Sequence, residues 1–252
     1  MLKILEKDDL EKLLKFCRAG ILSTRISCYA LSYGFDRDFL TFWGNNDSEE
    51  FNCIVAKFEN NITVCADEDA DFDELSEFLS VIGYGTLTCN SEVAEQLGFT
   101  DFTVKNGFVY SGETTFFDTE NASESDINAI YNLISTAIPD SFPRDKESYL
   151  NFLSDFTFRQ RRGYARAKCI HCDGKVASSA ITSAESENSA VISGVACDEN
   201  YRKYGFGKKT VLSLASELKK EKSNVYVIAL SSSAEGFYKH IGFCECEKIA
   251  FI

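Results

Sequence analysis

The chain has 252 residues, of which 44% are hydrophobic and 26% are charged, and its formal net charge is −13. This hydrophobic content excludes wholesale disorder and is ample for the core of one large domain or two of moderate size. The negative charge argues against nucleic acid or an anionic membrane as a partner. It would favour a cationic substrate, although solubility alone also explains it.

The N-terminus alternates apolar and charged residues at helical spacing and lacks the apolar run of a signal peptide. No stretch approaches the ~20 apolar residues that cross a bilayer. We therefore expect a cytoplasmic protein. The ten cysteines are then expected to be reduced and mostly packed in apolar surroundings, as at Cys17, Cys28, Cys65 and Cys197.

The charge is unevenly divided along the chain. Residues 1–112 hold 9 basic and 20 acidic side chains, whereas residues 113–252 hold 17 and 19. A polar stretch poor in aliphatic residues, 111–126, separates the two parts and ends at a helix-start signal. The sequence predicts a first domain over 1–112, a linker over 113–123 and a second domain over 124–252.

The predicted elements of the first domain include a buried strand in "FLTFW", a strand over 61–67 and a helix over 72–82 capped by Asp71 or a neighbour. A strand over 83–90, a short helix over 91–99 and a strand over 106–112 follow. The segment before the helix over 72–82, "DEDADFDEL", has no glycine and carries several carboxylates, which would repel a phosphate.

The second domain is predicted to begin with helices over 126–138, capped by Ser123 or Ser125, and over 146–160. A hairpin follows, with strands over 163–171 and 175–183 around an Asp-Gly turn. A strand over 189–197 then leads through a glycine-rich loop into an amphipathic helix. A strand over 224–230, a short helix over 233–241 and a strand over 243–252 complete an α/β fold, an α+β mixed sheet with helices on both faces.

The two predicted domains share an order of elements. A strand, a short helix, the tripeptide "LGF" and a strand occupy residues 83–110, and a strand, a short helix, "IGF" and a strand occupy 224–252. This match predicts an internal duplication.

The glycine-rich loop, "NYRKYGFGKKTV", gathers four basic side chains around two glycines. A helix that starts just after such a turn presents free N–H groups and a partial positive charge to an anion. A Walker loop needs Ser or Thr after Gly-Lys, where this chain has Lys209, and so does not fit. A Rossmann turn needs a third glycine and a later carboxylate, and the strand over 224–230 ends instead in serines.

The pattern "YRKYGFG", with a strand before it and a helix after it, resembles the Arg/Gln-x-x-Gly-x-Gly/Ala signature of the GCN5-related N-acetyltransferase (GNAT) superfamily. "AEGFYKHIGF" resembles the family's Ala-x-x-x-Tyr-x-x-x-Gly-Phe ending. The resemblance covers residues 124–252. It implies the acyl-CoA N-acyltransferase fold, here in two tandem copies with a degenerate N-terminal domain that lacks a phosphate-binding loop.

The resemblance also implies roles for individual residues. The loop amides would bind the pyrophosphate of acetyl-CoA, a neighbouring strand would pair with its pantetheine arm, and Tyr238 would be the general acid that protonates the leaving thiolate. Ser231 stands where many relatives have an asparagine that contacts the cofactor. The implied cofactor-binding residues are Val195, Ala196, Cys197, Arg202, Lys203, Tyr204, Gly205, Phe206, Gly207, Lys208 and Ser231.

No general base is evident. Glu185, Glu187 and Glu199 are candidates only because they are acidic and close in sequence to the predicted site. We interpret each of them as a solvated charge in a loop. An acyl-enzyme at Cys197 is disfavoured because the family transfers the acyl group directly to the amine. His240 near Tyr238 is expected to lie on the other side of its helix.

The stretch "CIHC", Cys169 to Cys172, resembles half of a zinc site. Its only counterpart is the distant pair Cys244 and Cys246, so we interpret it as thiols at a strand end. No metal is expected.

The sequence thus predicts an acyl-CoA-dependent N-acetyltransferase that acts on a small-molecule or peptide amine. The alternative is a regulatory module that binds CoA without turnover, and a third possibility is a scaffold whose acidic first domain binds a basic protein. Many relatives have two strands after the Gly242-Phe243 position, where this chain has one. The first domain, or a partner subunit in a homodimer, is expected to complete the edge of the substrate cleft.

Overall fold

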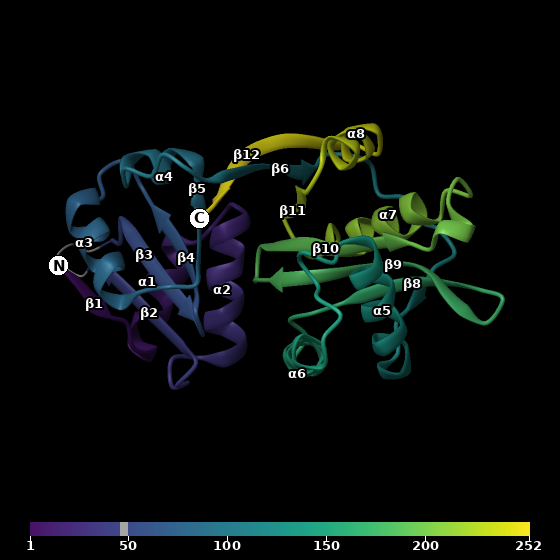
Figure 1. Ribbon diagram of the computed structural model, residues 1–252, viewed down its shortest axis with the longest axis horizontal. Coiled ribbons are helices and arrows are strands. Elements are labelled where there is room, and N and C mark those ends of the chain that lie inside the picture. The colour runs from purple at the N-terminus through teal and green to yellow at the C-terminus, as the bar shows by residue number, and fades with distance from the viewer. Residues whose placement is uncertain (46–49) are drawn as a thin grey trace. The chain divides into compact units, whose positions relative to one another are not determined.

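The computed structural model, which describes residues 1–45 and 50–252, repeats one order of helices and strands along the chain (Figure 1). In the first half a strand, two helices, three strands, a helix, a strand, a helix and a strand follow one another. These are β1 (Leu2–Ile4), α1 (Leu10–Phe16), α2 (Ile21–Tyr33), β2 (Leu40–Asn45), β3 (Cys53–Phe58), β4 (Asn61–Ala66), α3 (Phe72–Ile82), β5 (Thr86–Asn90), α4 (Ser91–Gln96) and β6 (Thr103–Tyr110).

The second half has the same ten elements in the same order. They are β7 (Glu120–Asn121), α5 (Ile127–Ala137), α6 (Lys146–Arg161), β8 (Ala167–Cys172), β9 (Lys175–Glu185), β10 (Ser189–Cys197), α7 (Phe206–Leu218), β11 (Asn224–Ala229), α8 (Ser232–His240) and β12 (Phe243–Phe251). Short 3-10 turns, Lys7–Asp9 and Glu124–Asp126, precede α1 and α5, and a third, Glu199–Tyr201, precedes α7.

Strand pairing repeats as well. In the first half β1, β2, β3 and β4 pair as antiparallel neighbours, and β4 pairs with β5 in parallel. In the second half β7, β8, β9 and β10 pair as antiparallel neighbours, and β10 pairs with β11 in parallel. Shared element order and shared pairing confirm the duplication that the sequence predicted.

The chain divides into two compact units, and neither is a single stretch of sequence. Unit 1 consists of Met1–Phe108, Ile228–Gly236 and Glu245–Ile252, and unit 2 consists of Val109–Val227 and Phe237–Cys244. Within unit 1 the end of β12 pairs antiparallel with β5, with Ile249 opposite Asn90 and Phe251 opposite Thr88. The last strand of the second half therefore completes the sheet of the unit built mainly from the first half.

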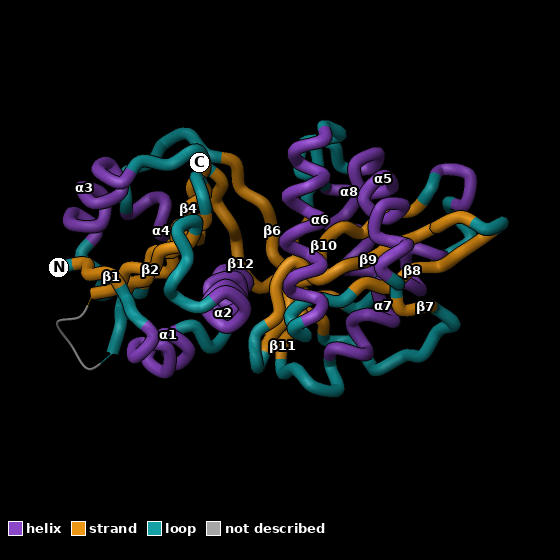
Figure 2. Tube along the Cα trace, turned by 90° about the horizontal axis from the view of Figure 1, so that it is seen from below, coloured by secondary structure: helices purple, strands orange, loops and turns teal. Residues whose placement is uncertain are grey.

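Both units have helices on both faces of the sheet (Figure 2). In unit 1, α1 and α2 bury Leu13 and Ile26 on one face, and α3 and α4 bury Leu75 and Val93 on the other. In unit 2, α5 and α6 pack one cluster against β9 and β10, while α7 covers the opposite face. This arrangement confirms the predicted fold class.

Three differences from the sequence prediction have local reasons. Helix α2 was not predicted because its buried residues occupy most of its circumference and leave no amphipathic period. The three-residue β1 is largely exposed and carries little strand signal. Strand β7 lies inside the predicted linker 113–123, and since it pairs with β8, sheet structure of the second half begins before residue 124.

No disulfide links the cysteines in the described part of the chain. Among the described residues, no helix combines the length and the apolar character needed to cross a membrane.

Candidate active site

The predicted diphosphate loop, residues 202–208, lies between the turn that follows β10 and the start of α7. Gly205 is the N-cap of α7 and has φ +77°, a left-handed conformation that favours glycine. A Cβ built at Gly205 would meet no atom within 4 Å, so this glycine is needed for its backbone angles and not for space. Lys203 also has a positive φ, +69°, so the loop turns twice through the left-handed region.

The loop leaves main-chain donors at the N-terminus of α7. The first hydrogen bond of this helix joins Lys209 N–H to the Gly205 carbonyl at 3.0 Å, and no side chain caps its start. The N–H groups of Phe206, Gly207 and Lys208 precede that bond and have no acceptor within the helix. Donors of this kind and the helix dipole favour an anion.

The corresponding helix of unit 1 has the opposite chemistry. Helix α3 is capped by Asp71, whose Oδ1 accepts a hydrogen bond from Glu74 N–H at 3.0 Å. Burial, followed by repulsion from Asp69 and Glu68, raises the pKa of Asp67 in the preceding segment. The chain's own carboxylates therefore occupy the position that the loop of α7 leaves open, in agreement with the sequence prediction of a degenerate first copy.

Basic and aromatic side chains surround the diphosphate loop. Arg202, Lys203 and Lys208 are exposed, and Arg202 Nε lies 3.5 Å from the Cys197 carbonyl oxygen. Tyr204 is 67% exposed, and its ring centroid lies 6.0 Å from that of Phe206. The loop thus presents positive charge and an aromatic surface to solvent next to the N–H groups at the start of α7, of which Gly207 N–H is directed at Cys197 Sγ.

Strand β10 carries a bulge just before the predicted pantetheine-binding residues. Its register against β9 shifts by one residue between Ser193 and Ala196, and Gly194 within the shift has φ +53°. A Cβ at Gly194 would lie 2.6 Å from Ile134 Cδ1 and 2.8 Å from Ile181 Cγ1, so glycine is required for space as well. The parallel pairs with β11 run from Ser189 to Ile192, and β10 continues beyond them to Cys197.

The bulge was not predicted from the sequence. The available signal was Gly194 in the middle of an otherwise continuous strand pattern, which often marks a bulge. Ser193, at the start of the shift, has a buried Oγ without a hydrogen-bond partner among the described residues. Leaving such a hydroxyl unpaired typically costs ~1–3 kcal/mol.

Tyr238 lies on α8 with 6% of its surface exposed, and its ring packs against Phe243 with centroids 5.6 Å apart. Burial raises the pKa of the Tyr238 phenol, which therefore stays protonated over the physiological range. A protonated phenol agrees with a proton donor, but close packing would also be expected of a purely structural tyrosine. Its catalytic role stays a prediction.

Two other predicted residues are engaged locally. Ser231 Oγ accepts a hydrogen bond from Ala234 N–H at 3.3 Å at the start of α8 and lies 3.0 Å from Ser233 Oγ. Burial raises the pKa of the Cys197 thiol, which disfavours a thiolate nucleophile there. Val195 and Ala196 follow the bulge directly, next to Cys197.

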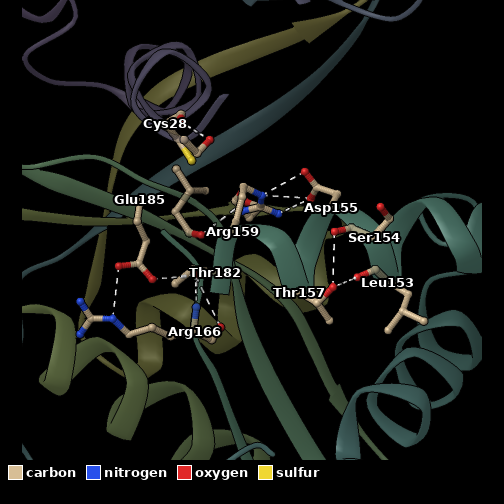
Figure 3. Close-up of polar contacts among 12 residues, drawn as sticks. Cys28, Leu153, Ser154, Asp155, Thr157, Arg159, Arg166, Thr182 and Glu185 are labelled. Carbon is tan, nitrogen blue, oxygen red and sulfur yellow. Dashed lines mark hydrogen bonds and ion pairs between the residues drawn. The ribbon is translucent and has the colours of Figure 1, made fainter. Parts of the chain in front are cut away.

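The candidate bases differ in their surroundings. Glu185 is fully buried, with Thr182 Oγ1 donating to its Oε1 at 2.8 Å and Arg166 Nε 3.2 Å from its Oε2 (Figure 3). The interpretation of Glu185 as a solvated loop charge was therefore wrong, because the bulged end of β9 turns it inward onto Arg166. Glu187 and Glu199 are exposed.

The mixed sheet of unit 2 thus contains two neighbouring parallel strands, β10 and β11, of which β10 is bulged, and the helix between them, α7, starts at an uncapped glycine. Residues 127–243 match the model of the Acetyltransferase (GNAT) family. No curated protein matches the chain in sequence.

Solved structures extend this likeness to the whole chain. A tandem GNAT protein from the clavulanic acid biosynthesis pathway superposes with a TM-score of 0.64 at 12% identity, covering 100% of this chain and 97% of that one. A GCN5-related N-acetyltransferase from Sphaerobacter thermophilus gives a TM-score of 0.60 at 11% identity, with coverage of 100% and 94%. A GNAT-family acetyltransferase from Colwellia psychrerythraea gives 0.57 at 11% identity, with coverage of 100% and 98%.

Residues 127–243 therefore form a domain of the GNAT family of acetyltransferases, and the chain as a whole has the tandem GNAT fold.

Proposed function

We propose that this protein transfers an acetyl group from acetyl-CoA directly to an amine. The observation that carries the proposal is the contrast between two equivalent helix starts. Gly205 opens α7 without a side-chain cap beside several cations, whereas Asp71 closes the start of α3 with a carboxylate. Only the second copy is therefore suited to the diphosphate of coenzyme A.

The bulge in β10 supports the position of the acyl group. Main-chain groups after Ile192 lie beyond the parallel pairs with β11 and so can pair with the amides of a pantetheine arm. A main-chain N–H beside the bulge would polarise the thioester carbonyl. Loss of such a donor typically raises the activation free energy by about 3 kcal/mol. The unpaired Ser193 hydroxyl offers one further polar group at this position.

The proposed reaction has few steps. The neutral amine nitrogen attacks the thioester carbonyl carbon, the carbon–sulfur bond breaks, and the thiolate of CoA leaves. Tyr238 is the proposed donor of the proton that converts this thiolate to a thiol. The proton lost by the amine passes to water, because neither Glu187 nor Glu199 has surroundings that distinguish it as a base.

A CoA-binding module without turnover is the second candidate. It is favoured by the side chains on α8, since Ser231 is engaged in capping and Tyr238 is packed among aromatic rings. Isothermal titration with acetyl-CoA, followed by detection of free CoA across a panel of amines, distinguishes the two. Binding with acceptor-dependent release supports the transferase, binding alone supports the module, and no binding at hundreds of micromolar rejects both.

Substituting Gly205→Asp locates the pocket. A carboxylate at the loop should weaken acetyl-CoA binding by at least about tenfold, because it repels the diphosphate and caps α7 as Asp71 caps α3. Gly163→Asp is the matched control, since Gly163 has φ +80° and equally open surroundings but lies at the end of α6. Equal affinity in the two variants would place the pocket elsewhere.

A further inference from the structure

Three metal-ligating side chains from two distant parts of the sequence, Asp126, Cys169 and His171, meet in unit 2, and Glu120 lies beside His171. Glu120 on β7 lies opposite Cys169 on β8, so their side chains share one face of the sheet. His171 follows two residues after Cys169, and Asp126 lies at the start of α5. Ligand atoms of Asp126, Cys169 and His171 all lie within 4.8 Å of one another.

The two ring nitrogens of His171 have different neighbours. Nε2 lies 3.1 Å from Asp126 Oδ1, while Nδ1 lies 3.3 Å from Glu120 Oε1 and 3.9 Å from Cys169 Sγ. A histidine that binds a metal through one nitrogen usually donates its other N–H to a carboxylate. Asp126 is placed for that second role.

Asp126 is itself held in position. Its Oδ2 accepts hydrogen bonds from Ser123 N–H at 2.8 Å and Ser123 Oγ at 2.6 Å, which leaves Oδ1 directed at His171. The first of these contacts is one half of the capping box of the turn before α5. The imidazole is therefore oriented by a carboxylate whose own conformation is determined by the helix start.

The distances around Nδ1 agree with a tetrahedral metal. With metal–nitrogen and metal–oxygen bonds near ~2.0 Å and a metal–sulfur bond near ~2.3 Å, a tetrahedron separates nitrogen from sulfur by ~3.5 Å and nitrogen from oxygen by ~3.3 Å. The observed 3.9 Å to Cys169 Sγ and 3.3 Å to Glu120 Oε1 lie close to these values. Glu120 is outside the group whose ligand atoms all lie within 4.8 Å of one another, so its exposed side chain has to turn toward Cys169 to complete the ligand set. Of the four residues, His171 and Asp126 line a cavity of about 650 Å³, from which an ion or a water molecule can approach the imidazole.

We propose that Cys169, His171 and Glu120 bind a divalent transition metal, with zinc the best match to a sulfur, nitrogen and oxygen donor set, and that Asp126 orients His171 from outside the coordination shell. Water from the cavity is the fourth ligand. The ion would join β7 to β8 and secure the segment that leads into α5.

The surrounding charges are consistent with a bound dication. Lys168 Nζ is paired with Glu217 at 2.7 Å and so does not neutralise the carboxylates of Glu120 and Asp126. A metal would displace the thiol proton and offset both negative charges. The competing arrangement is a metal-free imidazolium held between Glu120 and Asp126.

Titration with Co²⁺ of tag-free protein stripped with a chelator tests the proposal. One equivalent should bind and give a near-ultraviolet thiolate-to-cobalt charge-transfer band, and Zn²⁺ should displace it. Metal analysis of protein purified without chelator should show about one zinc per chain. A wild-type protein that binds no stoichiometric Co²⁺, or binds it without this band, overturns the proposal.

Single substitutions test which side chains bind the metal. Cys169→Ser should abolish the band, His171→Gln should abolish stoichiometric binding, and Asp126→Asn should weaken affinity by about 10–100-fold. Cys172→Ser is the matched control, because Cys172 is the thiol at the end of the same strand. A band that survives Cys169→Ser, or that disappears equally with Cys172→Ser, contradicts the assignment. Far-ultraviolet circular dichroism checks folding, and the wild-type titration decides the question even where a variant does not fold.

Discussion

At the scale of single residues, Tyr238 carries the most specific mechanistic expectation. Its phenol is buried and protonated, so removing the hydroxyl should leave the packing against Phe243 largely intact. If the phenol protonates the leaving thiolate, Tyr238→Phe should lower kcat by about 10²-fold or more and leave acetyl-CoA affinity unchanged. Steady-state kinetics with titration calorimetry measure both, and an unchanged kcat would make Tyr238 a structural residue.

Glu247 on β12 is a largely buried carboxylate at the start of α2. Its Oε1 accepts a hydrogen bond from Ile21 N–H at 2.7 Å and so caps α2 from a distant part of unit 1. Burial raises the pKa of Glu247, and the Ile21 N–H opposes that shift. The folded state therefore binds this proton more tightly than the unfolded state, and the group's contribution to stability falls as pH rises from the unfolded pKa through the folded pKa.

Glu247→Gln keeps an acceptor for Ile21 and removes the ionisation. The variant should therefore gain stability relative to the wild type as pH rises from mildly acidic to neutral. Urea unfolding at the two pH values measures the difference. A stability difference that does not change with pH would show that Glu247 does not titrate differently in the folded state.

At the scale of elements, the bulge of β10 depends on one glycine. Gly194→Ala should destabilise the protein by about 2–4 kcal/mol, because the methyl group collides with Ile134 and Ile181 at a left-handed residue. Gly174→Ala is the control, since Gly174 has φ +73° but open surroundings, and should cost only ~1 kcal/mol. Chemical denaturation compares the two, and equal costs would show that Ile134 and Ile181 move aside.

Also at the scale of elements, the starts of α7 and α3 could be distinguished from the sequence alone. A glycine at the start of α7 and an aspartate at the start of α3 act on the next few residues of the same chain. Their effects are local, so residue type and spacing were enough to predict an open anion site in one copy and a capped helix in the other.

At the scale of the whole molecule, the pairing of the end of β12 within unit 1 has a consequence for stability. Ala250 is fully buried in the same cluster as Leu87 and Val93 of the first half. Ala250→Asp should destabilise unit 1 by about 3 kcal/mol or more, because it buries a carboxylate beside apolar side chains. Lys248→Asp on the same strand, at an exposed position, should change stability by less than ~0.5 kcal/mol.

The sole tryptophan, Trp43, reports on this unit. It lies on β2 and packs edge-to-face against Phe78 of α3. Urea unfolding followed by Trp43 fluorescence should have a lower midpoint in the Ala250→Asp variant than in the wild type. The midpoint of the Lys248→Asp variant should stay near the wild-type value. Equal midpoints in all three proteins would mean that unit 1 does not need the C-terminal strand.

The amino-acid sequence by itself determined the repeated ending of each half (a strand, a short helix and a strand), the glycine-rich loop and the acidic counterpart in the first copy, because each depends on periodicity or on residues adjacent in the chain. Tertiary structure alone decided where β12 pairs, that Glu185 is buried against Arg166, and that Glu120 and Asp126 converge on Cys169 and His171. The physical reason is that strand pairing and buried charge depend on contacts between residues far apart in sequence. A pattern such as "CIHC" cannot reveal carboxylates that reach it only when β7 joins β8.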